Sequence, residues 1–184
     1  MISKEEAMSM VKENVKNKNL RKHMLAVAAI LKRLALELSE DEIQWEILGI
    51  VHDIDYEETQ DDPERHALVS AEMLEGKVPE ELIRGVKSHN HEHTGIEPRS
   101  AMEHALIAAD ASSGLVIATA LVMPNKKLEE ARPESVIKKY GDTSFAKNID
   151  RDRILHCKEF GLSKEEFLEL SLEALQEIHE ELGL

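Results

Sequence analysis

Apolar residues recur at helical spacing along most of the chain. One face of the segment 20–38 carries Val27, Ile30, Leu31, Leu34 and Leu38, and one face of the segment 164–182 carries Phe167, Leu170, Leu175, Ile178 and Leu182. Spacings of three, four and seven residues are typical of an amphipathic helix. No segment alternates with a period of two over more than four residues, so the pattern predicts an all-α fold.

Capping and turn residues mark where these helices begin and end. Four Ser-x-x-Glu boxes predict N-termini, at Ser3/Glu6, Ser39/Glu42, Ser100/Glu103 and Ser163/Glu166. Pro63, Pro79 and Pro133 suit a first helical residue, and Gly141, Gly161 and Gly183 suit helix ends. Together they predict helices near 4–16, 20–38, 40–53, 63–75, 79–89, 101–122, 133–140, 151–159 and 164–182.

Length and composition indicate one globular unit. The 184 residues are 42% hydrophobic but only 3% aromatic, so the core must be built from aliphatic side chains and methionine. The segment between Pro124 and Pro133 is rich in Lys and Glu. We expect it to separate a helical core, residues 1–123, from a C-terminal helical extension, residues 124–184, that packs on this core.

Charge and cysteine content exclude several classes of protein. The net charge of −14 argues against nucleic acid as a partner, because phosphate backbones are bound by Lys and Arg. A single cysteine excludes an internal disulfide, and residues 1–6 lack an apolar signal region, so a cytoplasmic location is expected. The apolar stretch Ala105–Met123 contains Asp110, which favours a buried helix over a membrane span.

Six ionisable residues lie on apolar helix faces or directly after an apolar run. They are His23, His52, Asp53, His66, His89 and Asp110. A single buried histidine is usually a hydrogen-bonded core residue, but a buried carboxylate is costly unless it is paired or binds a metal. One metal centre would account for all six. Imidazoles and carboxylates without thiolates favour divalent Fe, Mn, Co, Ni or Zn, and six ligands can hold one ion or two.

The order of these residues resembles the HD-domain superfamily of metal-dependent phosphohydrolases. The residues that carry the resemblance are His23, the doublet His52-Asp53 in Gly-Ile-Val-His-Asp-Ile-Asp, and Asp110 in Ala-Ala-Asp, within roughly 20–122. His66 and His89 match the two additional histidines of dinuclear members, so the arrangement is similar to that of the HD-type dinucleoside tetraphosphate hydrolases. Asp55 and Tyr56 stand where many members have Gly-Lys, a lysine that can meet substrate phosphate.

The resemblance implies an all-α HD-type bundle and hydrolysis of a phosphoester or phosphoanhydride in a small substrate, a class that includes nucleotides. His23, His52 and Asp110 would bind one metal, His66 and His89 the second, and Asp53 would bridge them. Two divalent ions would activate a water for attack on phosphorus and make the site locally positive in an acidic protein.

The cations that bind the rest of such a substrate are a separate prediction. Arg84 and Lys87 flank His89 on its helix, and the extension offers a further group at Lys138, Lys139, Lys147 and Arg151. We expect the extension to fold over the metal site and to supply phosphate contacts from this set.

Two other functions fit the same residues. A few members of the superfamily carry a dinuclear iron site and activate O₂, so an oxygenase is one alternative. A non-catalytic regulatory module is the other, although every ligand position holds a competent residue type. The sequence indicates neither the substrate nor the oligomeric state.

Overall fold

The structure is a computed structural model that describes residues 1–184, and every regular element in it is helical. The order of the elements is α1 (Lys4–Asn14), α2 (Lys18–Leu38), α3 (Glu42–Val51), α4 (Tyr56–Thr59), α5 (Leu68–Leu74), α6 (Glu80–His89), α7 (His91–Thr94), α8 (Ala101–Leu121), η1 (Leu128–Glu130), α9 (Pro133–Gly141), α10 (Arg151–Ile154), η2 (Leu155–Phe160), α11 (Lys164–Glu177) and α12 (His179–Leu182). The predicted all-α fold is confirmed.

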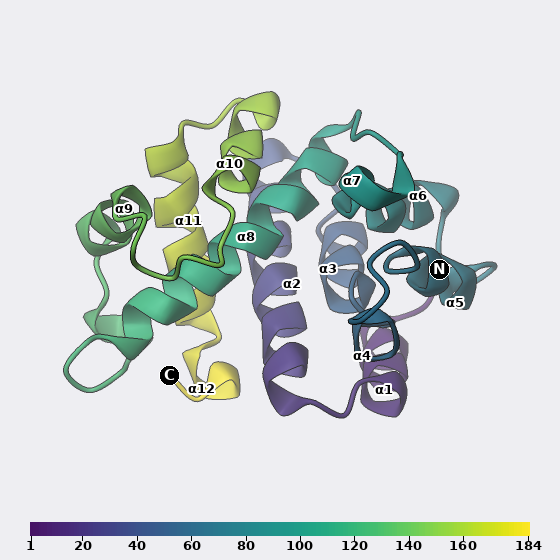
Figure 1. The fold of residues 1–184 in the computed structure, drawn as a ribbon, viewed down its shortest axis with the longest axis horizontal. Coiled ribbons are helices and arrows are strands. Elements are labelled where there is room, and N and C mark those ends of the chain that lie inside the picture. Colours follow the sequence, from purple (N-terminus) through teal and green to yellow (C-terminus); the bar gives the residue numbers. More distant parts are fainter.

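Two long helices, α2 and α8, organise the molecule. Figure 1 shows α8 crossing the middle of the bundle, with α2 beside it. Helix α2 packs against α3, α8 and α11, and α8 packs against α6 on one side and α10, η2 and α11 on the other. Because α8 is surrounded in this way, a side chain near its centre can meet residues from both halves of the chain.

Residues 124–184 pack on α8 and α2. Phe167, Leu168 and Leu175 of α11 are fully buried, and they belong to the same hydrophobic cluster as Ile30 and Leu34 of α2. A single core therefore runs through both segments of the chain. The division at residues 123 and 124 stays a prediction, because nothing in this packing marks a boundary there.

The apolar stretch predicted to be a buried helix forms α8. It is the one helix long and apolar enough to cross a membrane, but two thirds of that stretch is buried inside the protein. Ser112, Ser113 and Thr119 place hydroxyls in the core and satisfy them within the helix, by donating to carbonyl oxygens three or four residues earlier. The burial agrees with a core helix.

Two of the four predicted capping boxes are confirmed. The Ser3/Glu6 and Ser163/Glu166 pairs each satisfy the first-turn amides in both directions. Ser100 caps α8 by accepting from Glu103 N–H, but the Glu103 carboxylate binds Arg99 N–H instead. The Ser39/Glu42 box is wrong. Ser39 adopts a left-handed conformation with φ 59° and ends α2, and Asp41 caps α3.

Most observed helix ends lie within about two residues of the prediction, and three helices differ more. The helix expected from Pro63 begins only at Leu68, and the segment before it forms turns. The helix expected at 151–159 is a short α-helix followed by the 3₁₀ helix η2, and the last helix is interrupted at Ile178. The reason for the first difference lies at the candidate site, where a distant carboxylate holds the start of α5.

Candidate metal centre

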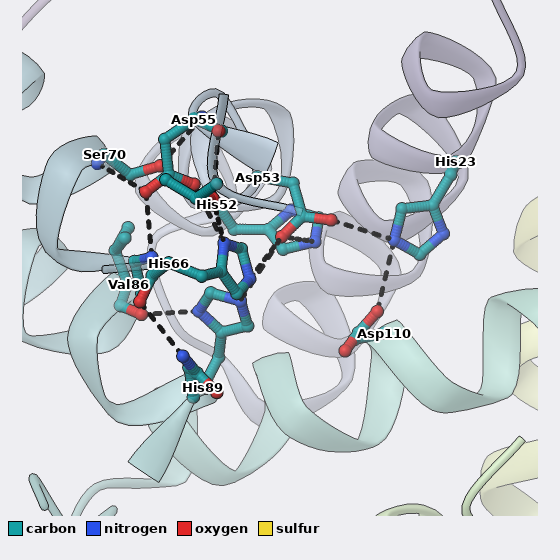
Figure 2. A network of polar contacts seen from close by, with 12 residues as sticks. His23, His52, Asp53, Asp55, His66, Ser70, Val86, His89 and Asp110 are labelled. Atoms are coloured by element: carbon teal, nitrogen blue, oxygen red, sulfur yellow. Dashed lines mark hydrogen bonds and ion pairs between the residues drawn. The ribbon is translucent and has the colours of Figure 1, made fainter. Parts of the chain in front are cut away.

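The six side chains predicted to bind metal converge from five places in the fold. His23 comes from α2, the His52-Asp53 doublet follows α3, His66 lies in the turn before α5, His89 ends α6, and Asp110 lies in the middle of α8. Figure 2 shows these residues directed toward one another around Asp53. His52, Asp53 and His89 are buried, whereas His23, His66 and Asp110 are partly exposed.

The carboxylate of Asp53 is the centre of the cluster. Its Oδ1 lies 3.5 Å from His52 Nε2, 3.4 Å from His66 Nε2 and 3.3 Å from His89 Nε2. Its Oδ2 lies 3.7 Å from His23 Nε2, which is 3.1 Å from Asp110 Oδ1. Two groups of three ligands, one with His23 and His52 and the other with His66 and His89, share Asp53.

Each of the four histidines is held by its other ring nitrogen. His52 Nδ1–H donates to the Gly49 carbonyl at 2.9 Å, and His89 Nδ1–H donates to the Val86 carbonyl. His66 Nδ1 pairs with Asp55 Oδ1 at 2.9 Å, and His23 Nδ1 lies 3.2 Å from the Ser113 hydroxyl, which itself donates to the Asp110 carbonyl. All four Nε2 atoms are therefore left for the centre of the cluster, as metal-binding histidines require.

The titration of these groups follows from their burial and charges. Burial lowers the pKa of His52 to about 4, so its Nε2 is unprotonated at neutral pH. Burial alone would raise the pKa of Asp53, but the surrounding imidazoles hold it well below its usual range. Burial opposes a charge on His66, yet its bonds to Asp53 and Asp55 raise its pKa to about 10.

The structure adds Asp55 to the predicted site. This side chain is buried, and its Oδ1 holds His66 while its Oδ2 accepts from the N–H groups of Ala67 and Ser70, each at 2.9 Å. Ala67, at φ 73°, provides no side-chain cap, so Asp55 caps α5 from a distance. This explains why the local pattern misplaced the start of that helix. The signal in the sequence was the carboxylate two residues after the doublet.

A cavity of about 510 Å³ opens over the ligands. Its wall contains Leu20, His23, Asp53, Tyr56, His66, His89, Asn90, Glu92, Asp110, Asp150 and Arg153. A more apolar hollow of about 450 Å³ lies elsewhere on the surface, but its wall contains no histidine. The polar cavity is therefore the better candidate for a metal-dependent active site. Asp150 and Arg153 come from the C-terminal extension, which therefore forms part of this wall.

None of the six cations predicted to bind substrate lies in that wall. Arg84 pairs with Glu103 at 3.1 Å, Lys139 lies over the Phe145 ring, and Arg151 donates to five backbone carbonyls of the extension. Lys87 is half-buried outside the cavity, while Lys138 and Lys147 are exposed away from it. The extension instead brings Arg153, whose Nη2 lies 3.4 Å from Asp110 Oδ2.

The donor set fits a divalent metal. His52 Nε2 is buried without any hydrogen-bond partner, which is costly for a polar atom unless something coordinates it. His66 Nε2 and His89 Nε2 lie 3.1 Å apart, a distance at which two acceptor nitrogens repel unless a proton or a cation lies between them. Four imidazoles and two carboxylates suit Fe, Mn, Co, Ni or Zn.

Comparisons with known proteins identify one family and two relatives. The HD-domain family model matches residues 20–135. Ribonuclease Y of Acholeplasma laidlawii is 32% identical over 96 residues, and ribonuclease Y of Oleidesulfovibrio alaskensis is 30% identical over 100 residues. Each alignment covers about half of this chain but only 18% of the relative. No solved structure matches significantly.

The family match spans more than half of the chain and contains all six converging residues. Members of this family are typically metal-dependent hydrolases with an all-α fold, and both properties agree with the helical bundle and the histidine–aspartate cluster described above. The chain belongs to the HD-domain family.

Proposed function

We propose that the protein is a metal-dependent phosphohydrolase that cleaves a phosphoester or phosphoanhydride bond in a small substrate. The observation that carries the proposal is the shared carboxylate of Asp53, which belongs to two ligand triads at once. Two cations held by these triads would suit phosphoryl transfer, in which the attacking and leaving oxygens both need a positive charge beside them.

Each side chain has a part in this proposal. His23, His52 and Asp110 would hold one ion, His66 and His89 would hold the second, and Asp53 would be shared between them. Divalent ions bound there would lower the pKa of a water molecule and neutralise charge on the phosphoryl oxygens. Asp55 orients His66, and the cavity above the ligands is the place for substrate.

The relatives support hydrolysis of a phosphorus–oxygen bond, since both are named as ribonucleases. We do not propose RNA as the substrate of this chain. The net charge of −14 and the single Arg in the cavity wall favour a small substrate over a polyanion.

The test is a hydrolysis screen with phosphomonoesters, phosphodiesters and dinucleoside polyphosphates, each with manganese, iron and cobalt. Metal-dependent release of product that is lost in Asp53→Ala, with helical content retained, is the expected result. Oxygen consumption with iron, and no anaerobic turnover with manganese, would instead identify an oxygenase. Protein that binds no metal when purified without chelator would identify a regulatory module.

A further inference from the structure

The charged groups around the cavity are distributed unevenly. Arg153 is the only Lys or Arg in its wall, whereas Glu92 and Asp150 face it without serving as ligands. Both of these acidic residues are exposed, while the ligands below them are buried or partly buried. The deep part of the cavity thus holds the metal site and one guanidinium, and the more exposed part is acidic.

Arg153 is fixed close to the metal site. It lies in α10, where Asp150 caps the helix by accepting from Asp152 N–H at 2.9 Å and Ile154 is fully buried. Its Nη2 donates to the His89 carbonyl at 2.6 Å and to Asp110 Oδ2 at 3.4 Å. No protein acceptor binds Nε or Nη1, so each of these nitrogens remains free to donate a charged hydrogen bond to a phosphoryl oxygen.

From these positions, and resting on the proposed function, we infer that the substrate carries a single phosphoryl group. Arg153 binds that group beside the metals, and the charges of Glu92 and Asp150 repel compounds with further phosphates. One phosphoryl group is matched by the cations in the deep part of the cavity. A chain of additional phosphates would have to lie against two carboxylates with no cation beside it, which is unfavourable.

The same two carboxylates indicate the other part of the substrate. A carboxylate accepts hydrogen bonds from hydroxyl groups, and the only hydrophobic wall residues are Leu20 and Tyr56. A small alcohol rich in hydroxyls therefore fits best as the group released with phosphate. The sugar of a sugar phosphate and the ribose of a nucleoside monophosphate share this chemistry.

The substrate preference is tested on the manganese-loaded protein with four compounds. These are a hexose monophosphate, a nucleoside 5′-monophosphate, the triphosphate of the same nucleoside and a short oligoribonucleotide. We expect kcat/KM to be highest for a monophosphate, and the two monophosphates distinguish sugar from nucleoside. A preference for the triphosphate or the oligoribonucleotide would overturn the inference but leave the proposed hydrolase in place. No hydrolysis of any phosphate compound would overturn both.

The acidic wall is tested by the double change Glu92→Gln with Asp150→Asn. Both substitutions keep the size of the side chain, and the new amide at position 150 retains an oxygen that can cap α10. The kcat/KM ratio of triphosphate to monophosphate should rise about fivefold, because two exposed repulsive charges are removed. Glu159→Gln removes an exposed charge on η2, outside the cavity wall, and should leave the ratio unchanged. An unchanged ratio in the double variant would contradict the role of the two acids.

Arg153 is tested by Arg153→Ala and Arg153→Lys, with Lys158→Ala as a control that removes an exposed cation of the same extension. Loss of charged hydrogen bonds should raise KM for the monophosphate and the Kd of inorganic phosphate, measured by calorimetry, about 10- to 100-fold. Metal content should stay unchanged, and the lysine variant should recover part of the affinity. Equal phosphate affinity in Arg153→Ala and the parent protein would show that Arg153 only supports Asp110.

Discussion

Asp55 shows how one carboxylate serves both the site and the fold. Its two oxygens accept from the His66 ring and from the N–H groups of Ala67 and Ser70 at the start of α5, so the position of the ring and the start of the helix depend on the same group. Burial would raise its pKa, but the bonds from His66 and Ser70 lower it, which keeps the group ionised at neutral pH. Asp55 therefore keeps the Nε2 of His66 directed toward Asp53.

The change Asp55→Ala should selectively weaken the second of the two metal sites that we propose. Removing a partner that orients a metal-binding histidine typically lowers metal affinity about 10- to 100-fold, so one of two bound manganese ions should be lost first. Calorimetric titration of the metal-free protein measures this. Asp61→Ala, at an exposed position in the following loop, is the matched control and should bind metal as the parent does. Two ions of unchanged affinity in Asp55→Ala would contradict this role of Asp55.

Metal binding should also release a proton from His66. Because its pKa is raised to about 10, this imidazole carries a proton at pH 7 in the metal-free protein, and Nε2 must lose it to coordinate an ion. His52, whose pKa is about 4, is already unprotonated at that pH and releases almost no proton when metal binds. Metal affinity should accordingly fall as the pH is lowered. Calorimetry at pH 7 in buffers of different ionisation enthalpy counts the protons, and a count of zero would contradict the expectation.

At the scale of elements, the site depends on the close contact between α2 and α3. A Cβ at Gly49 would lie 2.5 Å from the Cα and 2.6 Å from the N of Ala28, so only glycine allows the two backbones to approach this far. The carbonyl of Gly49 also holds His52. The packing of α3 therefore sets the position of the His52-Asp53 doublet relative to His23.

The change Gly49→Ala should lower the free energy of unfolding by about 2–3 kcal/mol, because the backbones of α2 and α3 must separate. Urea denaturation followed by circular dichroism measures this loss. Gly141→Ala is the control, since nothing lies within 4 Å of its added Cβ, and it should be neutral or slightly stabilising. A parent-like midpoint for Gly49→Ala would show that the helices can shift without cost.

Helix boundaries were predictable where the capping group is local. Ser3 and Ser163 lie three residues before their glutamates and cap as expected, and Pro133 begins α9. Ser39 has the same local pattern but ends the preceding helix, because Asp41 provides a better-placed oxygen two residues later. The start of α5 depends on Asp55, which is distant in sequence, so no local pattern could have revealed it.

At the scale of the whole molecule, metal should couple to stability. The ligands come from α2, α8 and the ends or flanks of α3, α5 and α6, so they are near one another only in the folded state. A ligand at about 100 times its Kd adds about 2.7 kcal/mol, which for a chain of this size corresponds to a rise in Tm of about 5–10 °C. Differential scanning calorimetry with and without manganese measures the shift. Asp53→Ala should show little or none, and equal shifts in both proteins would place the metal elsewhere.

The order of residue types along the chain was enough to establish the helical class and the six residues that converge, because apolar periodicity and ionisable groups on apolar faces are local properties. Which cations reach the cavity depended on the folded chain. Arg151 and Arg153 are two residues apart, yet the first binds carbonyls of its own loop and the second lies against Asp110. Asp55 and Arg153 have roles that depend on contacts between distant segments, and such contacts leave no periodic signal in the sequence.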